Sequence, residues 1–104
     1  MSDDFYQLLA RARSQANKMK DIAQSAAASD PDSDIWLYAS SLVTRWSDAL
    51  ATESLDWGLL GTLREEARTE RNRTGIWLHA CCNGIERDYV ALREASLSSG
   101  VGEG

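Results

Sequence analysis

The sequence predicts an all-α protein, a small antiparallel bundle of about four helices, and three observations lead to this prediction. Apolar residues recur at steps of three and four along most of the 104 residues, which is the spacing of one helix face. No stretch alternates apolar and polar residues for long enough to indicate a strand. The chain has one proline, and three of its seven glycines lie in the last five residues, so its body contains few turn signals. Short connections between consecutive helices favour antiparallel packing.

The periodicity divides the chain into helical segments over residues 4–28, 33 or 34–52, 57–72 and 75–97. Together they predict one domain over residues 1–97, followed by a flexible tail over residues 98–104, "SSGVGEG". The apolar stripes expected to form the core comprise, in order along the chain, Phe5, Leu8, Leu9, Ala12, Ala16, Met19, Ile22, Ala23 and Ala26; Ile35, Ala39, Leu42, Val43, Trp46, Ala49 and Leu50; Leu59, Leu60, Leu63 and Ala67; and Leu78, Cys81, Cys82, Ile85, Tyr89 and Leu92.

The composition, 43% hydrophobic and 26% charged, is typical of a globular protein. The acidic N-terminus does not look like a signal peptide, and the longest uncharged run, residues 74–85, is short of the ~20 apolar residues of a membrane helix. We therefore expect a cytoplasmic protein that has no contact with a membrane. Cys81 and Cys82 are adjacent, and on a helix their side chains diverge by about 100°, so we expect reduced thiols. With one histidine and no CxxC pattern, we expect neither a metal site nor a cofactor.

The net charge of −5 is concentrated in the middle of the chain. Residues 30–56 carry six acidic side chains against Arg45 alone, whereas the segments on either side nearly balance. Such a segment repels nucleic acid and anionic membranes, and it attracts basic partners.

The stretch "DPDSDIW" places Asp30, Asp32 and Asp34 at the spacing of the first ligands of a calcium-binding EF-hand loop. The sixth position of that loop needs glycine and is Ile35. The twelfth needs a bidentate glutamate and is Ser41. The pattern therefore indicates a connection in which Pro31 stops one helix and an acid or a serine caps the next.

The same aspartates indicate a binding surface, because three carboxylates exceed what a helix cap needs. Trp36 lies off the apolar stripe of its helix, and Asp56-Trp57 repeats the order of acid then tryptophan at the other end of that helix. An exposed tryptophan beside carboxylates is typical of a binding hot spot, although both tryptophans could instead widen the core. The residues predicted to bind a partner are Asp30, Asp32, Asp34, Trp36, Asp48, Glu53, Asp56 and Trp57.

The stretch "RNRTGIWLHA" resembles the motif of HEPN-type nucleases, helical domains with an arginine and a histidine four to six residues apart near the start of a late helix. Arg73 and His79 have five residues between them, and Thr74 follows the arginine. The resemblance implies that Arg73 binds the scissile phosphate and that His79 acts in acid–base catalysis. The net negative charge of the chain disfavours binding of RNA, which is itself an anion.

These observations favour a non-enzymatic protein that binds another protein with a basic, nucleic-acid-binding surface, and inhibits or adapts it. In general character this resembles immunity proteins, antitoxins and anti-CRISPR proteins. The first alternative is a structural subunit of a homo- or hetero-oligomer, since the apolar stripes of the first and last helices exceed what one bundle buries. The second alternative is the HEPN-like ribonuclease.

Overall fold

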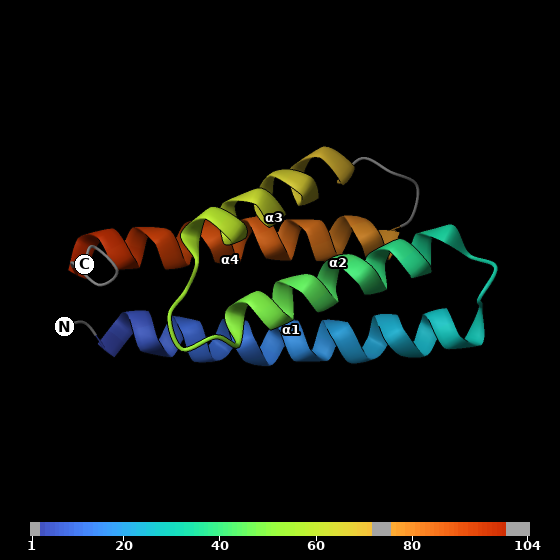
Figure 1. Ribbon diagram of the computed structural model, residues 1–104, viewed down its shortest axis with the longest axis horizontal. Helices are drawn as coiled ribbons and strands as arrows, with labels where there is room; N and C mark the ends of the chain where they lie inside the picture. Colours follow the sequence, from blue (N-terminus) through green and yellow to red (C-terminus); the bar gives the residue numbers. More distant parts are fainter. Residues whose placement is uncertain (1–2, 72–75, 100–104) are drawn as a thin grey trace.

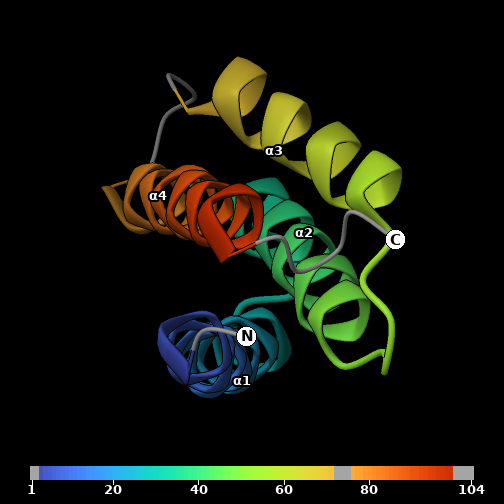
Figure 2. The ribbon, with the colours of Figure 1, turned by 90° about the vertical axis from the view of Figure 1, so that its left-hand side faces the viewer.

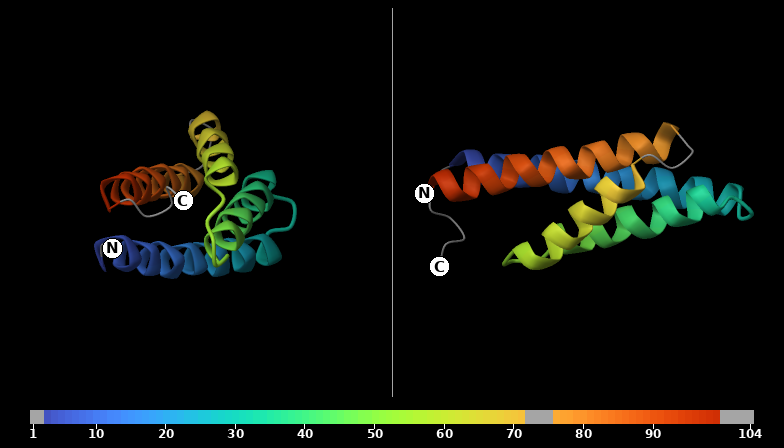
Figure 3. Two further views of the ribbon diagram at one scale, coloured as in Figure 1. Left: turned by 60° about the vertical axis from the view of Figure 1, so that its left-hand side comes forward. Right: turned by 90° about the horizontal axis from the view of Figure 1, so that it is seen from above.

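The computed structural model describes residues 3–71 and 76–99 of the chain, which form four α-helices and no strand (Figure 1). These are α1 (Asp3–Ser29), α2 (Asp34–Leu50), α3 (Trp57–Glu70) and α4 (Ile76–Ser99). Each helix runs antiparallel to the next, and α1 and α4 lie along the 46 Å long axis of the molecule (Figures 1 and 3). The predicted all-α bundle is confirmed.

The four helices are packed unequally. Helices α2 and α4 each contact all the others, whereas α1 and α3 have no Cα atoms within 8 Å of each other among the described residues. Figure 2 shows α3 separated from α1 by α2 and α4. Helix α1 therefore has neighbours on one side only, and much of its length faces outward.

The core follows the predicted stripes with two clear exceptions. Ala16 and Ala23 of α1 are fully buried, because their small side chains let α2 and α4 approach closely. Ile22 was expected in the same stripe but remains 50% exposed, and Leu59 of α3 remains 45% exposed. Each lies one residue, about 100°, from a buried position of its helix and is turned away from the core. Trp46, Leu42, Leu50, Leu60, Leu78, Ile85 and Leu92 fill the centre.

The ends of α2 are held by side chains. Ser33 is the N-cap, and its Oγ accepts a hydrogen bond from the Trp36 backbone N–H at 3.3 Å. At the other end, Arg13 of α1 donates from Nε to the Leu50 carbonyl at 2.6 Å and from a terminal nitrogen to the Thr52 carbonyl at 3.0 Å. Arg13 thus ties α1 to carbonyl groups that a helix end leaves unpaired.

Polar side chains fasten α3 to its neighbours. The Arg45 guanidinium of α2 binds both carboxylate oxygens of Glu66, at 2.8 and 2.7 Å, and the Tyr38 hydroxyl donates to the same carboxylate. Arg71, just after α3, binds Glu86 of α4 at 2.7 Å.

Helix α4 ends at Ser99, so it takes in the first two residues of the predicted tail, and residues 100–104 lie outside the described part of the chain. In the ranges that the structure describes, no helix is both long enough and apolar enough to cross a membrane.

Candidate functional site: the two ends of α2

The eight residues predicted to bind a partner do not form one surface. They fall into two groups at opposite ends of α2, where Asp34 and Asp48 are about 21 Å apart along the helix at 1.5 Å per residue (Figure 1). The Trp36 end comprises Asp30, Asp32, Asp34 and Trp36, and the Trp57 end comprises Asp48, Glu53, Asp56 and Trp57.

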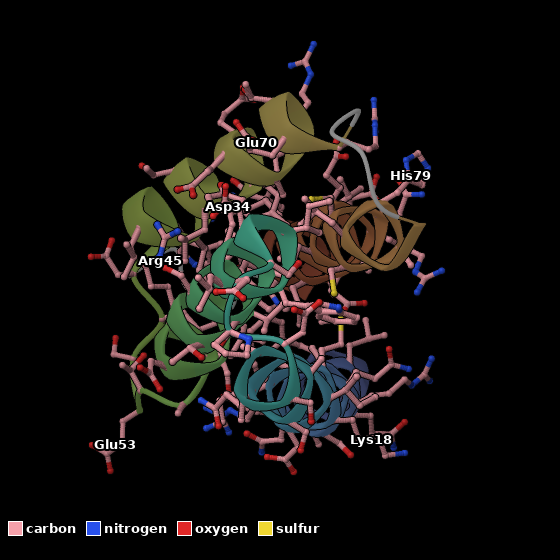
Figure 4. The ribbon with its side chains drawn as sticks, turned by 90° about the vertical axis from the view of Figure 1, so that its right-hand side faces the viewer. Lys18, Asp34, Arg45, Glu53, Glu70 and His79 are labelled. Atoms are coloured by element: carbon pink, nitrogen blue, oxygen red, sulfur yellow. The ribbon has the colours of Figure 1, made fainter. Side chains whose placement is uncertain are left out.

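At the Trp57 end, Asp56 and Trp57 contact other parts of the bundle, whereas Asp48 and Glu53 are exposed. Asp56 is the N-cap of α3, and its Oδ1 accepts a hydrogen bond from the Leu59 N–H at 3.2 Å. The Trp57 ring meets the Tyr89 ring edge to face, with centroids 6.0 Å apart, and the Arg93 guanidinium lies 4.8 Å from the Trp57 centroid. Both partners come from α4. Glu53 is exposed and points away from the bundle (Figure 4).

At the Trp36 end, the aspartates are not needed to cap α2, because Ser33 is its N-cap. Asp30, Asp32 and Asp34 are all exposed, within five residues of one another. Asp34 lies in the first turn of α2, where the helix dipole favours a carboxylate. Asp34 begins α2 and Glu70 ends α3, and because these helices run antiparallel both carboxylates lie toward the same end of the bundle (Figure 1).

A shallow, open groove lies next to this segment. It has a volume of about 560 Å³ and runs along the C-terminal half of α1, with Trp36 as its wall on α2. A second hollow, of about 320 Å³, lies between α1 and the first turns of α4. Ile22 borders both. The groove is lined by Asp21, Ile22, Ser25, Ala26, Ser29 and Trp36, and the hollow by Gln15, Lys18, Met19, Ile22, Ala80 and Cys81.

We call the groove and the hollow together the Ile22 surface. Sequence reasoning identified Trp36 but assigned Ile22 to the core, and so missed the centre of this surface. No local signal separates Ile22 from Ala23, because neighbouring helix positions such as Leu42 and Val43 are both buried in this core.

Tyr38, Arg45 and Glu66 form a hydrogen-bonded cluster between the two ends of α2. Burial, together with the hydrogen bond and charge of Glu66, raises the pKa of the Tyr38 hydroxyl. The two Arg45 hydrogen bonds lower the pKa of Glu66. The tyrosine therefore stays neutral and the carboxylate stays ionised, as suits a clamp between α2 and α3 rather than a proton-transfer site.

The structure describes only one member of the HEPN-like pair. His79 is exposed, points outward from α4, and has Nδ1 3.0 Å from the Arg71 carbonyl oxygen (Figure 4). Arg73 lies outside the described residues.

The two cysteines lie inside the bundle, away from solvent. Cys81 and Cys82 are buried free thiols, and burial raises the pKa of both, that of Cys82 to about 11. They are protonated at neutral pH and poor nucleophiles. Over residues 3–71 and 76–99, no three His, Cys, Asp or Glu side chains come together as they would around a metal ion.

Comparisons with protein-family models, curated proteins and solved structures find no match to this chain.

Proposed function

We propose that this chain is a non-enzymatic binding protein, and that its Trp36 end docks on a basic, nucleic-acid-binding protein and inhibits or adapts it. The observation that carries the proposal is the shallow groove between Ile22 and Trp36, which Asp21 lines and whose residues Ser29 and Trp36 flank the exposed Asp30, Asp32 and Asp34 in the chain. An apolar centre with a charged rim is the usual anatomy of a protein–protein interface.

The two parts of this surface have different physical roles. Trp36 and Ile22 supply area that loses water on contact, and tryptophan is the side chain most enriched among binding hot spots. The aspartates raise the rate of encounter with a basic partner and disfavour acidic ones. Because nucleic acid is itself an anion, a carboxylate cluster competes with it for the same basic surface.

The test is capture of partners by the tagged whole chain from a lysate of the source organism, with and without nuclease treatment. We expect a basic nucleic-acid-binding protein that is retained after nuclease treatment and lost when Asp32 and Asp34 are both changed to lysine. Retention of every captured protein by the Asp32→Lys, Asp34→Lys variant would contradict the proposal.

A second candidate, a structural subunit of an oligomer, is favoured by exposed apolar side chains on all four helices. The large ones are Tyr6, Ile22, Leu37, Leu59, Val90 and Leu97. Sedimentation equilibrium of the whole chain separates the two functions. A stable homo-oligomer insensitive to the Asp32 and Asp34 reversals would favour the structural subunit, and a monomer would remove the homo-oligomeric form of this candidate.

A further inference from the structure

Helix α3 lies on the outside of the bundle, and its two halves are held there in different ways (Figure 2). The first half, residues 57–63, buries Leu60 and Leu63 and begins with the Trp57 ring, which contacts Tyr89 and Arg93 of α4. The second half, residues 64–70, has the sequence "REEARTE" and buries Ala67 alone. Because burial of apolar side chains supplies most of the stability of a helix in a bundle, the second half is the more weakly held.

Ion pairs fasten this second half to the neighbouring helices. Glu66 binds the Arg45 guanidinium of α2 with both oxygens, at 2.8 and 2.7 Å. Arg71, the C-cap of α3, binds Glu86 of α4 at 2.7 Å. All four side chains are partly exposed, and ion pairs that water can reach contribute little to stability.

The buried thiol of Cys82 faces this half of α3. Burial raises the pKa of Cys82, and the charges of Glu86, Glu70 and Glu66 raise it further; the last two belong to residues 64–70. The neighbouring Cys81 lies about 100° around the axis of α4 and lines the hollow beside α1. The two thiols therefore report on two different contacts of α4, one with α3 and one with α1.

We infer that the second half of α3 opens away from the bundle while the first half stays packed, and that the Glu66 and Arg71 ion pairs are the latches that keep it closed. Segments held by few buried apolar side chains and by polar contacts near water open locally, well before the whole protein unfolds. Opening uncovers Cys82 and leaves Cys81 against α1. The inference does not depend on which partner the chain binds.

Hydrogen exchange of the free whole chain, read at single amides by NMR, compares the two halves directly. The amides of residues 61–63 bond to carbonyls of the first half or its cap, and those of residues 68–70 bond to carbonyls of the second. We expect residues 68–70 to be at least about tenfold less protected than residues 61–63. Equal protection in the two halves would overturn the inference.

Thiol labelling then tests the latch. Cys81→Ala leaves Cys82 as the only thiol of the chain, and Cys82→Ala leaves Cys81. In each background, Glu66→Gln removes the charge that binds Arg45. The matched control is Glu65→Gln, since Glu65 pairs only with Arg64 and Arg68 of its own helix among the ion pairs that the described residues form.

We expect Glu66→Gln to speed the reaction of Cys82 with iodoacetamide about threefold, which is the size of effect that a partly exposed ion pair has on an opening equilibrium. Glu65→Gln should leave the rate unchanged, and neither substitution should alter the rate at Cys81. Equal acceleration by Glu65→Gln and Glu66→Gln, or equal acceleration at both thiols, would contradict the latch, the latter because the whole bundle would then be opening. The exchange comparison uses the parent chain, so it decides the inference even if a cysteine variant fails to fold.

Discussion

The two ends of α2 carry the same order of residues, an acid shortly before a tryptophan, and the fold uses them differently. At the Trp57 end the acid is itself the helix cap, and the half-buried ring contacts Tyr89 and Arg93 and lines a cavity of about 220 Å³ beside α1. At the Trp36 end a serine is the cap, the aspartates are exposed, and the ring borders a groove. The same residue types therefore stabilise the fold at one end and leave exposed carboxylates for binding at the other.

The difference comes from which helix lies opposite. The Trp57 end faces the C-terminal half of α4, which supplies an aromatic ring and a guanidinium that contact the indole, and the N-terminal part of α1, which supplies Phe5 and Tyr6. The Trp36 end faces α1, which supplies alanines, serines and the exposed Ile22. Small side chains leave room beside a tryptophan, and that room is the groove.

Exchanging each tryptophan for alanine should have the largest effects, and opposite ones. Trp36→Ala should weaken partner binding about 100-fold, the 2–3 kcal/mol typical of a tryptophan hot spot. Trp57→Ala should leave binding nearly unchanged but lower the free energy of unfolding by about 2 kcal/mol, because it removes the contacts with Tyr89 and Arg93. Isothermal calorimetry and urea unfolding check the pair. A larger loss of affinity in Trp57→Ala would reverse the comparison.

Charge reversal at the two ends should separate them by about tenfold in affinity. Changing Asp32 and Asp34 to lysine should slow association, and the effect should shrink as salt is added. Changing Asp48 and Glu53 to lysine alters the net charge equally at exposed positions of the other end and should have little effect. Stopped-flow association rates at two salt concentrations distinguish these outcomes. Equal slowing by both pairs would mean that only net charge matters.

Removing single aspartates should show the structural role of the Trp57 end. Asp56→Ala takes away the cap of α3 and should lower the free energy of unfolding by about 1 kcal/mol. Asp32→Ala should change it by less than about 0.5 kcal/mol, since Asp32 is exposed and Ser33 is the cap of α2. Chemical denaturation measures both, and a costlier Asp32→Ala would assign it a structural role.

The smallest expected effect concerns the clamp between the ends. The pKa of Glu66 is lower in the folded protein than its ordinary 4.5, so its stabilisation is present above that pH and is lost as the pH falls through the folded value. Glu66→Gln should cost about 0.5–1 kcal/mol at neutral pH and less in acid. Unfolding midpoints of the parent and variant between pH 7 and pH 3 should converge. A difference that grows in acid would contradict the lowered pKa.

The periodicity of apolar residues was sufficient to predict the helices and most of the core, because each helix buries one face and its apolar residues recur along that face. It failed at Ile22 and Leu59, where the outcome depends on how far neighbouring helices reach around α1 and α3. Those distances are set by the whole bundle and leave no local pattern.

The sequence identified candidate binding residues, but it did not show that they lie in two separate groups at opposite ends of α2. Asp30, Asp32, Asp34 and Trp36 stand together because they lie within seven residues of the chain, whereas Asp56 and Trp57 are separated from them by the length of α2. The engagement of Trp57 depends on Tyr89 and Arg93, more than thirty residues away in the sequence. No short motif encodes such a contact.

The most direct test is hydrogen exchange of the whole chain, free and bound to the protein it captures. The account predicts that binding slows exchange of amides in residues 15–36 and leaves those of residues 48–59 unchanged. Protection centred on residues 48–59, with none around Ile22 and Trp36, would contradict it.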